Sequence, residues 1–161
     1  MIDETRIIRD LSNHIYDKNE FIDLIKSYNQ KGYDFFIGTD SQVFSKHVSV
    51  VTAICPRRID DFSGQSGRVF YIKERLDRKE IQSLRARMLL EAYRSIETAM
   101  DLDPYITTKI SIHLDVGSSG RSKTSMYQQE LQYLVTAQGY ECKIKPESWA
   151  AGGVADRFSK S

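Results

Sequence analysis

Hydrophobic residues recur at helical intervals in several parts of the chain, and the ends of some of these stretches carry helix signals. Asp17 and Glu20 have the spacing of a capping box, and Gly32 stands where that helix would end. The later stretch 78–100 has a long apolar stripe, and Gly139 stands where a further helix, over 122–138, would end. The pattern predicts helices over 17–32, 78–100, 122–138 and 150–160, and a helical turn over 5–11.

Between these helices the residues are mainly β-branched, aromatic or alternating apolar and polar, which is typical of strands. The strands predicted from this pattern are 33–39, 47–55, one beginning at 69–72, 109–115 and 140–144. Segment 59–67 is rich in Asp, Ser and Gly and is predicted to be a loop. Three consecutive strands with short connections favour an antiparallel meander. The later alternation of helix and strand completes an α/β fold with a mixed five-stranded sheet flanked by helices.

Chain length and composition set the domain organisation. The 161 residues suffice for one domain with a hydrophobic core, and apolar residues make up 40% of them, as in soluble globular proteins. We therefore expect a single domain over 1–161. In this division, 1–32 form an N-terminal helical extension and 33–161 form the core.

Other features narrow the cellular context and the partners. No apolar run approaches the roughly 20 residues needed to span a membrane, and 1–5 do not resemble the start of a secretory signal. Cys55 and Cys142 are far apart and form no zinc-binding pair, so we expect reduced thiols in a cytoplasmic protein. Because the net charge is only +1, nucleic-acid binding would depend on local basic patches and bound cations.

Two acids stand at the ends of predicted strands and directly follow apolar runs, Asp40 just after the first strand and Asp115 as the last residue of the fourth. If these strands are parallel neighbours, both carboxylates converge at the edge of the sheet where α/β proteins usually bind ligands. Two carboxylates close together repel each other, and a divalent cation removes that conflict. Oxygen ligands alone favour Mg²⁺ or Mn²⁺. The alternative is that each Asp is a solvated turn residue or a helix N-cap.

Two further acids are candidates for the same site. Glu91 lies at the border of the apolar stripe of the long helix, from which a carboxylate can reach over the sheet edge. Its alternative is an ordinary boundary position, paired with Arg87 or Arg94 at helical spacing. Asp156 lies in the last predicted helix, where the alternative is a routine surface residue.

These residues and their order give the chain a recognisable resemblance. It resembles the ribonuclease H-like superfamily and, more closely, a poorly characterised bacterial family of predicted ribonuclease H-related nucleases. The matching segments are IGTDSQV (37–43), SLRARMLLE (83–91), IHLDVG (112–117), KIKPES (143–148) and VADRFSK (154–160). They extend over most of the chain, from about residue 33 to residue 160.

The chain departs from the wider superfamily in two details. Related proofreading exonucleases carry Asp-x-Glu on the first strand, whereas this chain has Gln42 in the place of the Glu, which argues against that branch. Glu91 is predicted well inside its helix, whereas the superfamily's Glu stands near the helix start, so Glu80 remains an alternative.

The resemblance implies a metal-dependent nuclease. Its catalytic and metal-binding residues would be Asp40, Glu91, Asp115 and Asp156. Together they would hold two ions of Mg²⁺ or Mn²⁺. The substrate would be RNA, DNA or an RNA/DNA hybrid. The alternative is a non-catalytic nucleic-acid-binding or regulatory module on the same fold. A third possibility is an ATP-handling relative of the actin-like kinases. Such a protein would need two of these domains around its nucleotide, and 161 residues provide only one.

Contacts with nucleic acid would come from local cations. The candidates are Arg121, Lys123, Lys143 and Lys145, each of which could also be a solvated surface residue. The first two follow a Gly-Ser-Ser-Gly loop that leads into a predicted helix N-terminus, a place that favours phosphate. His113 could shuttle protons or be a buried structural histidine, and Trp149 could stack on a base or anchor the last helix.

Overall fold

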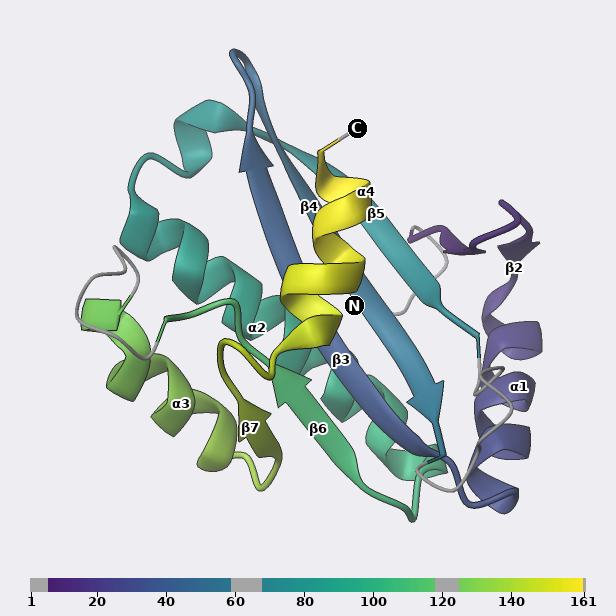
Figure 1. The fold of residues 1–161 in the computed structure, drawn as a ribbon. Coiled ribbons are helices and arrows are strands. Elements are labelled where there is room, and N and C mark those ends of the chain that lie inside the picture. Colours follow the sequence, from purple (N-terminus) through teal and green to yellow (C-terminus); the bar gives the residue numbers. More distant parts are fainter. Residues whose placement is uncertain (1–5, 59–67, 118–124, 161) are drawn as a thin grey trace.

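The computed structural model describes residues 6–58, 68–117 and 125–160. The predicted loop at 59–67 and the candidate cations Arg121 and Lys123 lie outside the described residues. Within them, the chain forms one seven-stranded mixed sheet in the order β2-β1-β5-β4-β3-β6-β7. Figure 1 shows the C-terminal helix crossing one face of this sheet, with α2 behind the opposite face.

The centre of the sheet is the predicted antiparallel meander, formed by β3 (Asp34–Val43), β4 (His47–Arg57) and β5 (Phe70–Asp77). On the other side of β3, β6 (Ile110–His113) pairs with it in parallel, and β7 (Glu141–Lys143) pairs in parallel with β6. The mixed α/β fold is therefore confirmed, including the parallel pairing on which the convergence of the carboxylates depends.

The strand that carries Asp40 is longer than the sequence predicts. The prediction ends it at residue 39, but Asp40 pairs with Val51 in the ladder, and β3 continues to Val43. Asp40 therefore lies inside the strand, and only Asp115 stands beyond the end of its own strand. The long hairpin with β4 supplies backbone partners after the β6 pairing has ended at Gly38.

The N-terminal segment differs from the prediction. The expected helical turn over 5–11 is wrong for β1 (Ile8–Asp10), which is a strand, and β2 (Ile15–Tyr16) pairs with it. Ile8 faces Ile72 across the β1–β5 pairing, and its side chain is buried. The sheet therefore has seven strands instead of five, because the open edge of β5 accepts β1. The predicted helix follows as α1 (Lys18–Gln30), with Asp17 as its N-cap.

The other helices are shorter than predicted. The stretch expected over 78–100 begins as a 3-10 turn, Arg78–Glu80, and becomes α2 (Leu84–Leu102) only after Ser83, whose hydroxyl accepts a hydrogen bond from the Ala86 N–H. The stretch expected over 122–138 contains a 3-10 turn, Ser125–Tyr127, and then α3 (Gln128–Thr136).

The predicted C-terminal helix contains an unusual turn. Ala150–Ala155 form a π-helical segment that continues directly into α4 (Asp156–Ser159). This segment lies against β3 so closely that a Cβ built on Gly38 would be 2.3 Å from the Ala151 nitrogen. Glycine within a strand often marks such a close approach of another backbone.

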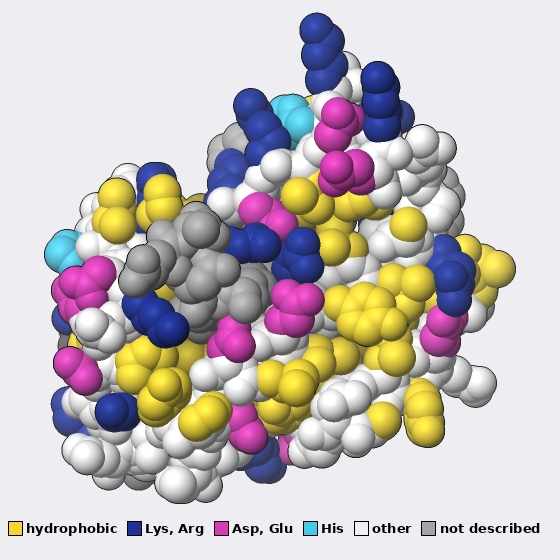
Figure 2. Space-filling view, turned by 180° about the vertical axis from the view of Figure 1, so that it is seen from behind, with side chains coloured by type: hydrophobic (Ala, Val, Ile, Leu, Met, Phe, Trp, Pro, Cys, Tyr) yellow, Lys and Arg dark blue, Asp and Glu magenta, His cyan; other side chains and the backbone are white. Residues whose placement is uncertain are grey.

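Hydrophobic residues pack on both faces of the sheet. The larger cluster lies between the sheet and α1, α2 and α3, and it includes Ile8 and Phe21 from the N-terminal segment. A smaller cluster lies under the C-terminal helix. Figure 2, a view from the α2 side, shows exposed hydrophobic side chains mixed with charged ones. Tyr93 and Met100 of α2 are exposed hydrophobic residues. Cys55 and Cys142 are free thiols, as expected.

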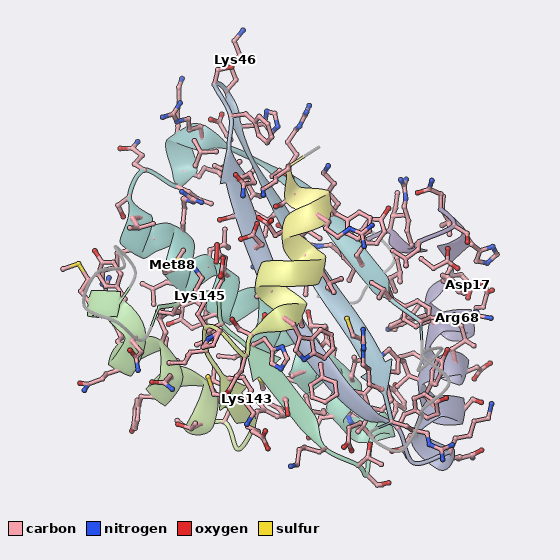
Figure 3. All side chains as sticks on the ribbon, viewed as in Figure 1. Asp17, Lys46, Arg68, Met88, Lys143 and Lys145 are labelled. Carbon is pink, nitrogen blue, oxygen red and sulfur yellow. The ribbon has the colours of Figure 1, made fainter. Side chains whose placement is uncertain are left out.

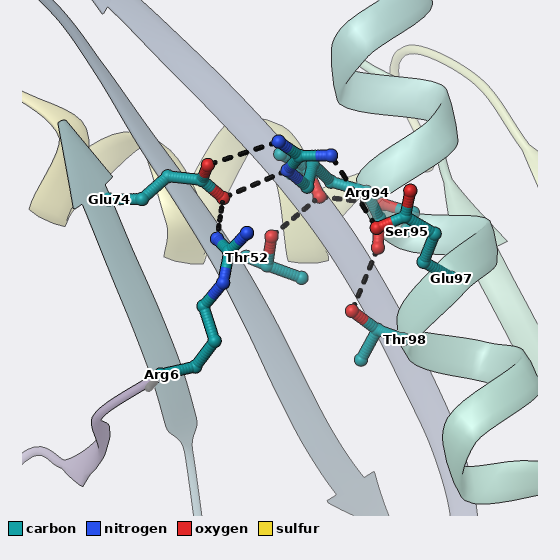
Figure 4. A network of polar contacts seen from close by, with 8 residues as sticks. Arg6, Thr52, Glu74, Arg94, Ser95, Glu97 and Thr98 are labelled. Carbon is teal, nitrogen blue, oxygen red and sulfur yellow. Dashed lines mark hydrogen bonds and ion pairs between the residues drawn. The ribbon is translucent and has the colours of Figure 1, made fainter. Parts of the chain in front are cut away.

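A polar network ties the N-terminal segment to the sheet and to α2 (Figure 4). Glu74 on β5 accepts two hydrogen bonds from Arg94 of α2, at 2.9 and 3.2 Å, and pairs with Arg6 at 2.6 Å. Arg94 also reaches Glu97. The suggested pairing of Arg94 with Glu91 is therefore not formed, which leaves the Glu91 carboxylate to other neighbours. No helix within 6–58, 68–117 and 125–160 is long and apolar enough to cross a membrane.

Candidate metal centre

Asp40 lies on the face of β3 that the C-terminal helix covers, and only 4% of it is exposed. Its Oδ2 accepts hydrogen bonds from Ser159 Oγ at 2.6 Å and from Gln42 Nε2 at 3.3 Å. Burial raises the pKa of the Asp40 carboxyl to about 6, and the charges of Asp115 and Asp156 act in the same direction. The two hydrogen bonds oppose this shift without cancelling it. The environment of Asp40 therefore disfavours its negative charge.

Glu91 approaches the same point from the opposite face of the sheet. It is buried on α2, and its Oε2 accepts a hydrogen bond from Ser41 Oγ at 2.7 Å. Burial raises the pKa of Glu91 well above its usual value, and the charges of Asp40 and Asp115 add to the effect. Adjacent strand residues point to opposite faces, so Ser41 turns toward α2 while Asp40 turns toward the C-terminal helix.

The other two acids are less buried, and each has a lysine partner. Asp115, just after β6, has its Oδ1 3.3 Å from Lys145 Nζ. Asp156, the first residue of α4, has its Oδ2 2.8 Å from Lys160 Nζ, and its Oδ1 accepts a hydrogen bond of 3.4 Å from Gln42. Gln42 therefore donates to both Asp40 and Asp156 and joins β3 to α4.

The structure brings the four acids together from β3, α2, the segment after β6 and α4. The charges of Asp115 and Asp156 act on Asp40, and those of Asp40 and Asp115 act on Glu91. Glu80, the alternative to Glu91, is exposed on the 3-10 turn before α2. Four carboxylates make an all-oxygen donor set that suits Mg²⁺ or Mn²⁺. As they stand, however, no three His, Cys, Asp or Glu side chains in the described parts of the chain form a group that could hold a metal ion.

Several residues that shape this site carry no obvious signal in the sequence. Ser41 and Ser159 each donate to a buried carboxylate, and Arg87 donates to both the hydroxyl and the carbonyl of Ser41. Gly152 lies beside Asp115, because a Cβ built on it would be 3.3 Å from Asp115 Oδ1. The hint for Ser159 is its spacing of three from Asp156, which puts both on one face of a helix.

The candidate nucleic-acid-binding lysines are both paired with acids. Lys143 Nζ lies 3.3 Å from Glu141 Oε1 on its own strand, and Lys145 contacts Asp115. Figure 3 shows both lysines on the β7 side of the sheet, whereas Lys46 stands at the tip of the β3–β4 hairpin. Of the two, only Lys145 reaches one of the four acids.

His113 and Trp149 have structural contacts. His113 is 1% exposed, and its Nδ1 accepts a hydrogen bond of 3.0 Å from the Ala150 N–H. Burial lowers the pKa of His113 to about 4, so the ring is neutral near pH 7. The Trp149 ring packs 5.0 Å from His113 and 5.1 Å from Phe36, and Arg57 stacks over it. These contacts anchor the start of the C-terminal helix on the sheet.

A three-stranded meander, two parallel strands beside it and acids from β3, α2, the end of β6 and the last helix define a protein of the ribonuclease H-like class. The chain belongs to the Ribonuclease H-like family, whose family model matches residues 18–160. It is also similar to YkuK, an uncharacterized protein of Bacillus subtilis (strain 168). The two are 30% identical over an alignment of length 161, and the alignment covers 88% of this chain and 90% of YkuK.

Proposed function

We propose that this protein is a metal-dependent nuclease that hydrolyses phosphodiester bonds of RNA, DNA or an RNA/DNA hybrid. The observation that carries this proposal is the burial of two neighbouring acids, Asp40 and Glu91, whose carboxylates accept hydrogen bonds from Ser159, Gln42 and Ser41 and have no basic side chain of the described residues bonded to them; burial raises the pKa of both. Burying like charges together is costly for stability, and bound cations offset that cost. Perturbed acids grouped in this way are typical of functional sites.

Each acid has a role in the proposed mechanism. Bound Mg²⁺ or Mn²⁺ ions, two in number, would supply an activated water and stabilise the leaving oxygen. Asp40 would be the central ligand and would help to hold both ions. Glu91 and Asp115 would hold the position next to the attacking water, and Asp156 would complete the other. Lys145 and Lys160, released from Asp115 and Asp156, would then be available to phosphate oxygens.

Labelled RNA, DNA and hybrid substrates, incubated with Mn²⁺ or with EDTA, test the proposal. The wild type is expected to cut at least one substrate with Mn²⁺ and none with EDTA. Asp40→Asn should abolish cutting, while its circular dichroism spectrum stays that of the wild type. Asp23→Asn is the matched control, because Asp23 is exposed on α1 and lies on another element. Equal cutting by Asp40→Asn and Asp23→Asn would refute the proposal.

One observation favours a second function, a nucleic-acid-binding module without turnover. Asp115 and Asp156 are already paired with lysines, so their charges are met without a metal. In that case the wild type would bind an oligonucleotide equally well with Mn²⁺ or with EDTA and would leave it intact. The same assay therefore separates the two functions.

A further inference from the structure

A second charged surface lies along the outer part of β5, beyond the C-terminal helix. A cavity of about 720 Å³ opens there, and its lining includes Arg6, Arg9, Tyr71, Lys73, Arg75 and Phe158. We call Arg9, Tyr71, Lys73, Arg75 and Phe158 the β5 strip. Figure 1 shows β5 running beside α4, and the stacked rings of Tyr71 and Phe158 join the two elements.

The β5 strip has a surplus of positive charge. The acid in the lining of the cavity, Glu74, is already shared by Arg6 and Arg94. No acidic side chain in the described part of the chain forms an ion pair with Arg9 or Arg75. Burial lowers the pKa of Lys73, and the charge of Arg75 adds to the effect, as expected where cations lie close together. Such a cavity attracts polyanions.

The strand register puts this surface on the same face of the sheet as Asp40. Residues directly opposite in antiparallel strands point to the same side, and Asp40, Val51 and Lys73 form one such row. Two strand spacings separate the ends of the row, so the Cα atoms of Asp40 and Lys73 are about 10 Å apart. An extended chain can connect the two sites past the end of α4.

The neighbouring row runs from Gln42 through Ser49 to Arg75. Gln42 donates to Asp40 and Asp156, so this row begins at the candidate metal centre. The hydroxyl of Ser49 is buried and has no hydrogen-bond partner in the described part of the chain. The row therefore links the candidate metal centre to the cations of the β5 strip.

Aromatic pairs flank the cations on both sides. Tyr71 and Phe158 stack with ring centroids 4.2 Å apart, and Phe44 and His47 stack at 4.7 Å near the tip of the hairpin. Desolvation lowers the pKa of the His47 ring, and the charges of Arg75 and Lys73 add to the effect. Cations interleaved with aromatic rings are the arrangement with which proteins hold single-stranded nucleic acid. Tyr71 is only 7% exposed and its ring face packs on Phe158, so the partly exposed rings of Phe44 and His47 are the ones that a base can reach. Bases in a duplex are stacked on each other and cannot use these rings.

We propose that the β5 strip binds the sugar–phosphate backbone of a single nucleic-acid strand and leads it away from the candidate metal centre. Lys73 and Arg75 contact successive phosphates, and Arg9 extends the contact toward β1. This inference rests on the proposed function only in taking the strand to be the substrate. Binding at the strip needs no metal and no cleavage.

Fluorescence anisotropy with a labelled single-stranded 12-mer in EDTA tests the strip without cleavage. The double variant Lys73→Ala/Arg75→Ala should bind about tenfold more weakly at 0.1 M salt. It should also lower the slope of log K against log salt by about 1.4, the value for two lost phosphate contacts. The control Lys18→Ala/Lys31→Ala removes the same charge from exposed positions on or next to α1 and should change neither quantity. The charge-preserving Lys73→Arg/Arg75→Lys should keep wild-type binding.

Equal effects of the strip variant and the α1 control would overturn the inference, as would a wild type that binds no oligonucleotide. An unlabelled duplex that competes as well as the unlabelled single strand would overturn the assignment to single strands. Cleavage is measured separately. If the strip variant loses binding and the wild type never cuts, the inference about the strip holds and the proposed nuclease function fails. If the wild type cuts and the strip variant has an unchanged salt slope, the inference about the strip fails and the proposed function holds.

Discussion

At the scale of single residues, the His113 ring contributes to stability only while it is neutral. It must stay uncharged to accept the hydrogen bond from the Ala150 N–H, and it is enclosed by Phe36 and Trp149. Its pKa of about 4 in the folded protein lies below the ordinary value of 6.5. The unfolded chain therefore takes up a proton at a higher pH than the folded protein does, and acid favours unfolding.

This gives a pH-dependent prediction. As the pH falls from 6.5 to 4, the titration of His113 should lower the free energy of unfolding by up to about 3 kcal/mol. His113→Asn keeps an acceptor near the Ala150 N–H and cannot titrate, so its stability should fall less over this window. Urea unfolding of both proteins at pH 7, 5.5 and 4.5 measures the difference. Asp40 and Glu91 act with the opposite sign, but they are present in both proteins and cancel in the comparison. Parallel pH curves would contradict the prediction.

At the scale of elements, the position of the C-terminal helix depends on Gly38. The π-helical segment touches the strand backbone there, and the next residues along the helix include Asp156 and Ser159, which approach Asp40 from above the sheet. The distance between β3 and the helix therefore sets the distances among the acids. A small displacement of the helix would separate Asp156 from Asp40 without changing any acidic residue.

Gly38→Ala should push this helix off the sheet. The new methyl group would meet the Ala151 backbone at 2.3 Å, a contact that no side-chain rotation relieves. We expect a loss of at least about 2 kcal/mol of stability, as for other overpacked sites, together with weaker Mn²⁺ binding. Gly153→Ala is the control, because its Cβ would meet only the Trp149 Cβ, at 3.9 Å. Thermal unfolding and calorimetric Mn²⁺ titration measure both effects, and equal melting temperatures of the two variants would refute the argument.

The elements also show how far the sequence carries a prediction. Helical stripes and alternating strands are local signals, so the meander, the parallel strand and the order of the acids can be predicted. The three-residue strand β1 cannot, because its stability comes from pairing with Phe70–Ile72, about sixty residues away. The extension of β3 through Asp40 likewise depends on its partner Val51. Gly38 signals a close approach, but the sequence does not say that Ala151 is the partner. The metal-binding and catalytic roles of the acids stay predictions.

At the scale of the whole molecule, the candidate metal centre costs stability when no ion is bound. Asp40 has a pKa of about 6, above the 3.8 of an ordinary Asp. The stability that its protonated form gives the folded protein is therefore lost as the pH rises through 6. Near neutral pH its ionised form would cost up to about 3 kcal/mol. Functional sites commonly carry such a cost, which the rest of the fold offsets.

Removing this charge should therefore stabilise the metal-free protein. Asp40→Asn keeps the shape of the side chain and an acceptor for Ser159, and in EDTA at pH 7.5 it should melt several degrees above the wild type. Adding Mn²⁺ should raise the melting temperature of the wild type and leave that of Asp40→Asn almost unchanged. Scanning calorimetry with and without Mn²⁺ makes the comparison. A variant that melts below the wild type in EDTA would show that Asp40 is a stabilising residue.

The incomplete coverage of β5 by β1 has a consequence for the behaviour of the protein in solution. In the described residues, β1 pairs with Phe70–Ile72 alone, so the register leaves residues 73–77 without a neighbour on that side. A bare sheet edge can recruit the edge of another molecule, and charged side chains are a common protection against such association. Lys73 and Arg75 stand on this edge. The same two cations would therefore keep the protein from aggregating edge to edge whenever no polyanion covers them.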